Sequence, residues 1–260
     1  MASHHRLLQL TIVVFSFSAS LVFNIVSADP VVDSVLSRVY DGYDQQGACW
    51  RAHSDSEDGF CCLKVKRQDR LNTAKSTRLY LLLTGQCYNN NGELDNSHAS
   101  SGMVGAFVLG LEKNNVSIIA GHPRMPMGSW GTPPEDWSLV KLGPNDYWGW
   151  KSEGGYTGQG TSWSWYSFLA PYGKSIRELT APLNFDDSGN CSEEDKCPST
   201  IIEGKLEIDS TQIDEAVFPL HLTLEGKIKG KKFAPKTWVL PFDTKSWSYK
   251  KPKGLPDMEG

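Results

Sequence analysis

The chain lacks the short motifs that identify common enzyme classes. It contains no Gly-x-Ser-x-Gly nucleophile elbow and no His-Glu-x-x-His metal-binding pattern. It has no Cys-x-x-Cys pair and no cysteine–histidine cluster at zinc spacing, which argues against a zinc site. The histidines beyond the N-terminal segment are scattered at His53, His98, His122 and His221. We therefore expect no metal and no cofactor, and we favour a binding protein over an enzyme.

The chain also lacks an excess of positive charge. It carries 26 Lys and Arg residues against 30 Asp and Glu residues, a balance that argues against a general nucleic-acid or anionic-membrane binder. Lysines nevertheless gather between Glu225 and Lys253. These lysines either prevent exposed strand edges from pairing with other chains or form a surface that binds an acidic partner.

Only one long hydrophobic run is present, and it lies at the N-terminus. Arg6 precedes a mostly apolar stretch from Leu7 to Val26, which ends in the small residues Val26-Ser27-Ala28. This arrangement predicts a signal peptide over residues 1–28, because a signal peptidase accepts small residues at its cleavage site. An uncleaved membrane anchor is the alternative, but polar residues within the run favour cleavage. The sequence thus predicts a periplasmic or secreted protein with no membrane span after cleavage.

All six cysteines follow this predicted signal peptide: Cys49, Cys61, Cys62, Cys87, Cys191 and Cys197. An even number of cysteines in an exported chain predicts disulfide bonds. Neighbouring residues in a strand point to opposite faces, so Cys61 and Cys62 should have different partners. Cys191 and Cys197 can close a local loop, which leaves Cys49 and Cys87 for the adjacent pair. The sequence does not decide whether Cys49 bonds to Cys61 or to Cys62.

The remaining pattern predicts a mainly β protein with one N-terminal helix. Asp29 and Pro30 suit a helix start, and the apolar spacing after them predicts a helix that ends near residues 40–42. From Phe60 onward, short apolar runs alternate with turn residues, which is typical of an antiparallel β-sandwich or barrel-like fold. The predicted strands are 60–66, 78–84, 103–112, 116–120, 137–142, 147–151, 162–170, 201–208, 218–228, 233–242 and 246–249.

Residues 29–260 are long enough for one large domain, and we expect a single disulfide-stapled β-rich domain. The predicted long loops are 89–102, 122–135 and 186–199. A weak domain boundary would fall within residues 186–199, where the chain is polar and rich in turn residues.

Tryptophan is concentrated in the middle of the chain. The candidate ligand-binding residues are Trp130, Trp148, Trp150, Tyr156, Trp163 and Trp165. If the strands at 147–151 and 162–170 pair through a loop over 152–161, their four indoles form one cross-strand patch. Exposed aromatic rings suit protein docking or sugar stacking, whereas the competing interpretation is that they fill the core.

Two functional hypotheses follow. The first is an exported non-catalytic binding module, such as a periplasmic inhibitor or neutraliser of another protein, that uses the loop Met125–Pro134 and the tryptophan-rich segment. The second is a glycan-binding or glycan-hydrolysing protein that uses the tryptophans as a platform. Glycoside hydrolysis needs two suitably spaced carboxylates, and Glu135 and Asp136 beside Trp137 are the pair to examine.

Overall fold

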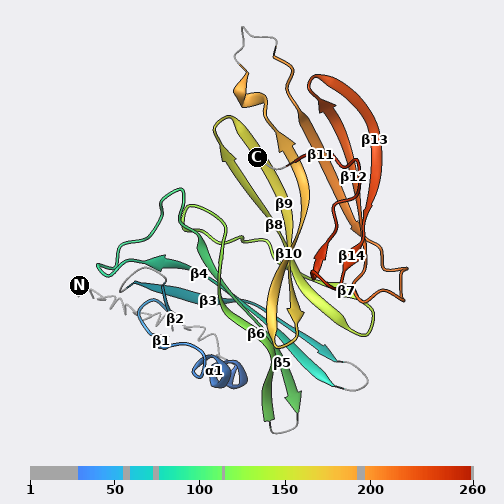
Figure 1. Ribbon diagram of the computed structural model, residues 1–260. Helices are drawn as coiled ribbons and strands as arrows, with labels where there is room; N and C mark the ends of the chain where they lie inside the picture. Colours follow the sequence, from blue (N-terminus) through green and yellow to red (C-terminus); the bar gives the residue numbers. More distant parts are fainter. Residues whose placement is uncertain (1–28, 55–58, 73–75, 113–114, 192–196, 259–260) are drawn as a thin grey trace, which may run out of the picture.

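In the computed structural model, the described residues form two large antiparallel β-sheets, a small two-stranded sheet and one short α-helix. Figure 1 shows how these elements are arranged. The structure describes residues 29–54, 59–72, 76–112, 115–191 and 197–258. The fold class predicted from the sequence is confirmed as sandwich-like, because neither sheet closes into a barrel. The predicted signal peptide lies outside the described residues. Within the described ranges, no helix is long and apolar enough to cross a membrane.

The helix α1 (Pro30–Leu36) begins where the sequence predicts it. Asp29 caps the helix, since its carboxylate accepts a hydrogen bond from the Val31 N–H at 3.0 Å. The helix ends at Leu36, earlier than expected, and the chain continues in turns to Tyr40. The Tyr40 hydroxyl donates to the Pro123 carbonyl at 2.9 Å, which fixes this segment against the first sheet.

The first sheet is a six-stranded meander in which each strand pairs with the next. Its strands are β1 (Gly42–Asp44), β2 (Cys49–His53), β3 (Phe60–Asn72), β4 (Thr77–Tyr88), β5 (Gly102–Glu112) and β6 (Asn115–Met127). Residues 102–109 of β5 are all buried. This sheet is therefore covered on both faces.

The second sheet is a seven-stranded meander. Its strands are β7 (Ser138–Gly143), β8 (Tyr147–Gly158), β9 (Thr161–Tyr172), β10 (Ser175–Asp186), β11 (Ile201–Ile208), β12 (Leu220–Ile228) and β13 (Lys231–Leu240). A 3-10 turn η1 (Ser188–Asn190) follows β10, and a small hairpin of β14 (Phe242–Asp243) and β15 (Ser248–Tyr249) follows β13. The edge strand β13 carries the exposed lysines Lys231, Lys232 and Lys236.

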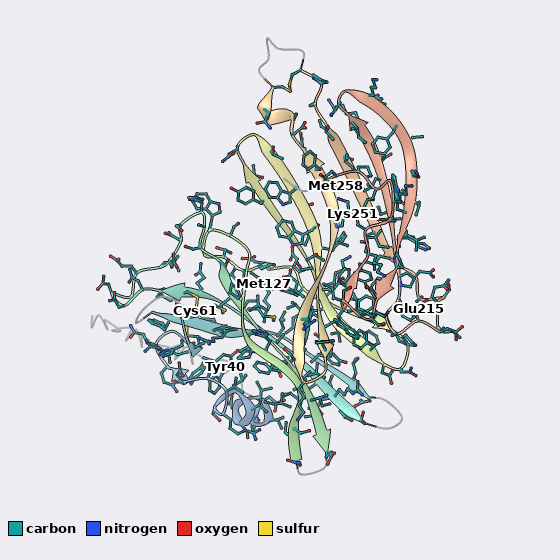
Figure 2. The ribbon with its side chains drawn as sticks, in the orientation of Figure 1. Tyr40, Cys61, Met127, Glu215, Lys251 and Met258 are labelled. Atoms are coloured by element: carbon teal, nitrogen blue, oxygen red, sulfur yellow. A yellow bond between two sulfur atoms is a disulfide. The ribbon has the colours of Figure 1, made fainter. Side chains whose placement is uncertain are left out.

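Three buried clusters form the core. The middle cluster joins the sheets and includes Tyr80 and Val104 from the first sheet with Trp150 and Leu169 from the second. A second cluster packs α1 on the first sheet. The third packs Leu255, Met258 and other C-terminal residues on the second sheet. Figure 2 labels Tyr40, Met127 and Met258, one from each cluster. Each sheet thus has apolar side chains buried on both faces.

The structure corrects the predicted loop over 152–161. Strands β8 and β9 continue through it, paired from Trp150↔Leu169 to Gly158↔Thr161, and only Gln159 and Gly160 remain as the turn. The glycines suggested a loop, but the Trp165 indole of β9 covers Gly154 of β8. Packing of aromatic side chains over its glycines therefore stabilises β8 as a strand, although the glycines alone suggest a loop.

Three strands were not predicted: β1, β2 and β10. Strand β10 contains Pro182, which argues against an interior strand because proline has no N–H to donate. The structure resolves this with a β-bulge between Pro182 and Asn184. Strand β6 also continues to Met127, into the region expected to be a loop.

All six cysteines form disulfides, as predicted, and the structure shows which of Cys61 and Cys62 bonds to Cys49. Cys49 bonds to Cys62 and Cys61 bonds to Cys87, while Cys191 bonds to Cys197. Cys61 and Cys87 lie directly opposite each other in the β3–β4 register. The first two bonds fasten neighbouring strands of the first sheet, and the third closes a loop at the end of the second.

Candidate binding groove

An open groove of about 780 Å³ lies beside the β8–β9 hairpin. We call it the aromatic groove, because Trp130, Tyr156 and Trp163 line it together with residues of β10 and β11. Its polar lining consists of hydroxyls and amides together with two carboxylates: Ser129, Thr157, Ser162, Ser164, Asn184, Asp186 and Glu203. Three segments that are distant in the sequence thus contribute to one surface.

Trp130 is the most exposed large aromatic residue in the described part of the chain, at 62% exposure. It lies in the turn from Ser129 to Thr132, which is closed by a hydrogen bond from the Thr132 N–H to the Ser129 carbonyl at 3.0 Å. Its φ is +55°, a left-handed conformation that bulky residues rarely adopt. Trp247 also has positive φ, but its ring packs against other aromatic side chains, whereas the Trp130 indole faces solvent.

The turn that carries Trp130 is fixed by its neighbours. Gly131, also at positive φ, donates its N–H to the Ser100 carbonyl at 2.9 Å. A Cβ at Gly131 would overlap the Asp95 carbonyl oxygen, so only glycine allows this close approach. The His98 ring lies 5.9 Å from the Trp130 ring. Packing of the turn on residues 95–100 therefore holds the indole in place.

Tyr156 and Trp163 form the opposite aromatic element of the groove. They are direct cross-strand neighbours on β8 and β9, and their ring centroids are 4.7 Å apart. The two-residue turn beyond them has Gln159 at φ +50° and Gly160 at φ +74°, the pattern that matches the twist of a tight hairpin. The hairpin therefore presents the pair on a regular scaffold.

Trp165 extends the aromatic surface along β9. Its indole N–H donates to the Ser167 hydroxyl at 3.2 Å, and that hydroxyl donates to a Glu178 carboxylate oxygen at 2.6 Å. Ser167 is almost completely buried, so these two hydrogen bonds hold the Trp165 ring in a fixed orientation.

Two hollows that include Trp165 share lining residues with the aromatic groove, a larger one of about 320 Å³ and a smaller one of about 200 Å³. The smaller one also includes Gly128 and Pro134, from the loop Met125–Pro134 predicted as a contact surface. A third hollow, of about 390 Å³, shares Ile201 and Glu203 with the groove and is also lined by Lys227 and Lys232.

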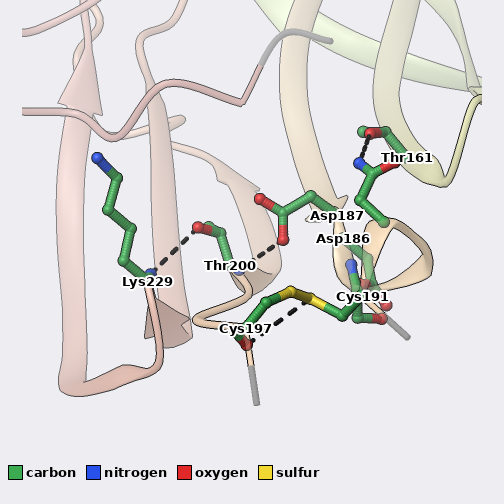
Figure 3. The surroundings of a disulfide bond; sticks show 9 residues. Thr161, Asp186, Asp187, Cys191, Cys197, Thr200 and Lys229 are labelled. Atoms are coloured by element: carbon green, nitrogen blue, oxygen red, sulfur yellow. Dashed lines mark hydrogen bonds between the residues drawn. A yellow bond between two sulfur atoms is a disulfide. The ribbon is translucent and has the colours of Figure 1, made fainter. Parts of the chain in front are cut away.

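A polar network closes the rim of the groove near the Cys191–Cys197 disulfide (Figure 3). The Asp187 carboxylate accepts the Thr200 N–H at 2.6 Å, and the Thr200 hydroxyl accepts the Lys229 N–H at 3.2 Å. The Asn190 side chain donates to the Thr161 hydroxyl at 3.1 Å. These contacts join the end of the β8–β9 hairpin to the β10–β11 connection and the β12–β13 turn.

The other tryptophans named from the sequence lie in the core. Trp150 is completely buried, and its ring packs edge-on against Tyr80 at 5.5 Å between the two sheets. Trp148 is half-buried and packs against the same cluster. Because Trp150 lies opposite Leu169 and Trp165 lies opposite Gly154, the four indoles do not form one patch. The carboxylates Glu135 and Asp136 are exposed but do not line the groove or its adjoining hollows.

The sequence does not predict the residues that β10 and β11 contribute to the groove. Asn184, Asp186 and Glu203 line the groove, and Asn184 accepts the Gly204 N–H at 3.0 Å. Strand β10 was not recognised, so no local signal placed these side chains beside Trp163. The pairing of β10 with both β9 and β11 brings them together.

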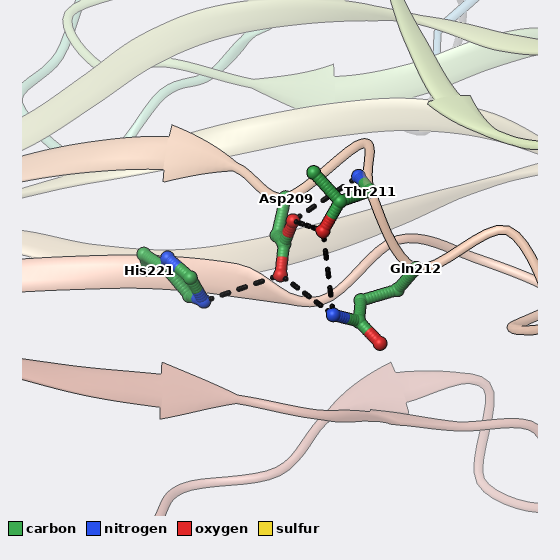
Figure 4. A network of polar contacts seen from close by, with 4 residues as sticks. All are labelled: Asp209, Thr211, Gln212 and His221. Atoms are coloured by element: carbon green, nitrogen blue, oxygen red, sulfur yellow. Dashed lines mark hydrogen bonds and ion pairs between the residues drawn. The ribbon is translucent and has the colours of Figure 1, made fainter.

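A second polar cluster lies outside the groove, where β11 is connected to β12 (Figure 4). Asp209 accepts hydrogen bonds from the Thr211 hydroxyl at 2.6 Å and the Thr211 N–H at 3.1 Å. His221 Nε2 lies 3.4 Å from the second carboxylate oxygen of Asp209. The Thr211 hydrogen bonds hold the pKa of Asp209 below its usual range, with His221 adding a smaller effect. These contacts fix the connection between β11 and β12.

Among the described residues, no group of three His, Cys, Asp or Glu side chains is arranged to hold a metal ion. The chain matches no known family model, no curated protein and no solved structure. The groove must therefore be interpreted from its own chemistry.

Proposed function

We propose that the protein is an exported, non-catalytic binding module that holds a segment of another protein in the aromatic groove. The observation that carries this proposal is the exposed Trp130, fixed in a left-handed turn at the edge of a groove lined by Tyr156 and Trp163. Large, rigid aromatic side chains are the residues that most often dominate binding energy in protein interfaces.

The composition of the β8–β9 hairpin supports a protein ligand. Residues 154–167 consist almost entirely of glycine, tyrosine, threonine, serine and tryptophan. Binding surfaces of antibodies use the same types, because tyrosine and tryptophan give contact area at low entropic cost while serine and glycine adapt their hydrogen bonds. Three disulfides accord with an oxidising compartment, and together with the predicted signal peptide they support a periplasmic or secreted location.

The proposal is tested by capture from a periplasmic or secreted fraction of the source cells. Immobilised protein without residues 1–28 should retain a partner protein at a fixed ratio and release it uncleaved. Trp130→Asn should lower retention at least about tenfold. Tyr43→Ala is the matched control, because Tyr43 is also an exposed aromatic residue, at 45% exposure, but lies on β1. Absence of a stoichiometric protein partner would contradict the proposal.

Glycan binding is the second candidate, because Trp163 and Trp165 line adjoining hollows with carboxylates nearby. Aromatic faces stack on sugar rings, and carboxylates accept hydrogen bonds from sugar hydroxyls. Titration with neutral oligosaccharides, followed by tryptophan fluorescence, tests this candidate. A saturable change that Trp130→Asn abolishes would favour it over a protein ligand.

A further inference from the structure

Among the described residues, every charged side chain that lines the aromatic groove and the two hollows that include Trp165 is acidic. Asp186 and Glu203 line the groove itself, and Glu178 lines the smaller hollow. Of the groove and the three hollows that share its lining residues, only the third hollow is lined by described lysines, since Glu203 shares it with Lys227 and Lys232. Within the groove and the two hollows that include Trp165, an anionic ligand would therefore meet like charge, whereas a cationic ligand would find opposite charge.

These carboxylates have no cationic partner within the described part of the chain. Asp186 accepts the Ser188 N–H at 2.8 Å and Glu178 accepts the Ser167 hydroxyl, but neither forms an ion pair there. Glu203 lies directly opposite Glu225 in the β11–β12 register. Like charges in this position repel each other. Lys227 and Lys232 line the hollow that Glu203 and Glu225 share. Of the three carboxylates, Asp186 and Glu178 are therefore the two whose spaces contain no described lysine or arginine.

The aromatic faces of the groove carry no cation from the described part of the chain. Elsewhere in the described structure, positive side chains lie over the rings of Phe60, Tyr166, Tyr172 and Trp238. No described cation lies over Trp130, Tyr156, Trp163 or Trp165. An aromatic face attracts a cation electrostatically, and the attraction increases when water is excluded.

The three spaces share lining residues, which favours an extended ligand over a small one. The aromatic groove shares Gly155 with the smaller hollow and shares Trp163 and Ser164 with the larger one. A chain that follows this path passes the carboxylates of Glu203, Asp186 and Glu178 as well as the aromatic rings. The ligand should therefore carry several positive charges along its length.

We infer that the groove binds an extended segment of the partner protein that carries arginine or lysine side chains. The inference rests on the proposed function and adds the chemistry of the ligand. Guanidinium groups can stack on the aromatic faces and donate to the carboxylates at the same time. Because the interaction is partly electrostatic and exposed to solvent, it should weaken as salt increases.

Fluorescence anisotropy with short labelled peptides tests the inference. A peptide of alternating arginine and serine should bind, and a matched peptide of alternating glutamate and serine should not. Binding of the arginine peptide should weaken about three- to tenfold with Glu203→Gln. It should weaken at least about tenfold with Trp130→Asn. Glu207→Gln should leave it unchanged, since Glu207 lies on the same strand but pairs with Lys205 at 2.7 Å, outside the groove.

Equal binding of the two peptides, no effect of Glu203→Gln, or no effect of about 0.5 M salt would overturn the inference. If retention of the captured partner depends on Trp130 but not on Glu203 or on salt, the proposed binding function stands and the inferred cationic character of the ligand is wrong. If only an uncharged labelled oligosaccharide binds, the inference is overturned together with the protein ligand.

Discussion

At the scale of single residues, chemically identical side chains have different roles because of where their strands pair. Trp150 is completely buried between the sheets, whereas Trp163 lines the groove, and both lie in the same hairpin. Trp130 differs from both, since its backbone is left-handed and its indole is exposed. The turn geometry, and not burial, holds it in position.

The left-handed conformation of Trp130 predicts a difference between two substitutions that both remove the indole. Asparagine tolerates positive φ, whereas a β-branched residue does not. Trp130→Val should therefore be less stable than Trp130→Asn by about 1–2 kcal/mol in urea unfolding. Equal stability of the two variants would show that the turn is not held in this conformation in solution.

At the scale of elements, the sequence predicts a strand well where one face of the strand is buried and the other is exposed to solvent. In β12, Leu220, Leu222 and Leu224 are buried while Glu225 is exposed, and the alternation is visible without a structure. Strand β10 was missed because Pro182 interrupts its pattern and the bulge that accommodates it depends on β9. The groove was only partly predictable, because it requires the pairing of β9, β10 and β11, which no local pattern encodes.

The disulfides should differ in their contribution to stability. Cys61–Cys87 spans 26 residues and Cys191–Cys197 spans 6, so the first restricts the unfolded chain more strongly. Replacing both members of a pair with alanine should cost about 3.5 kcal/mol for Cys61–Cys87 and about 2.2 kcal/mol for Cys191–Cys197. Chemical denaturation measures both values. A larger loss for the Cys191–Cys197 pair would contradict this assignment.

The Asp209 cluster predicts a pH dependence. The pKa of Asp209 is lower in the folded protein than in the unfolded chain, because Thr211 stabilises the charged form. Its stabilising effect is therefore present above the unfolded pKa and is lost as the pH falls below about 4. Asp209→Asn should lower the Tm at pH 7, and the difference from wild type should shrink toward pH 3. A difference that is constant with pH would show that charge is not involved.

At the scale of the whole molecule, the cluster between the sheets joins two meanders that could otherwise unfold separately. Tyr80 from β4 packs against Trp150 from β8, and Arg67 of β3 donates to the Trp137 carbonyl at 2.9 Å. The first sheet is fastened by two disulfides, and the second carries the groove. The molecule thus combines a first sheet that is cross-linked by disulfides with a second sheet whose paired strands form the aromatic groove.

This arrangement predicts that the two sheets unfold together. Calorimetry should show one transition, with equal calorimetric and van't Hoff enthalpies. Trp150→Ala should lower the free energy of unfolding by about 3–5 kcal/mol, because it leaves a cavity between the sheets. Two separate transitions in the wild-type protein would contradict the single domain expected from the sequence.

The central claim is that the aromatic groove, and Trp130 in particular, is the binding site. The most direct measurement is the amount of partner protein that the wild-type protein, Trp130→Asn and Tyr43→Ala retain from the same extract. We predict that wild type and Tyr43→Ala retain equal amounts, and that Trp130→Asn retains at least about tenfold less. Equal retention by all three would contradict the claim and place the binding surface elsewhere on the molecule.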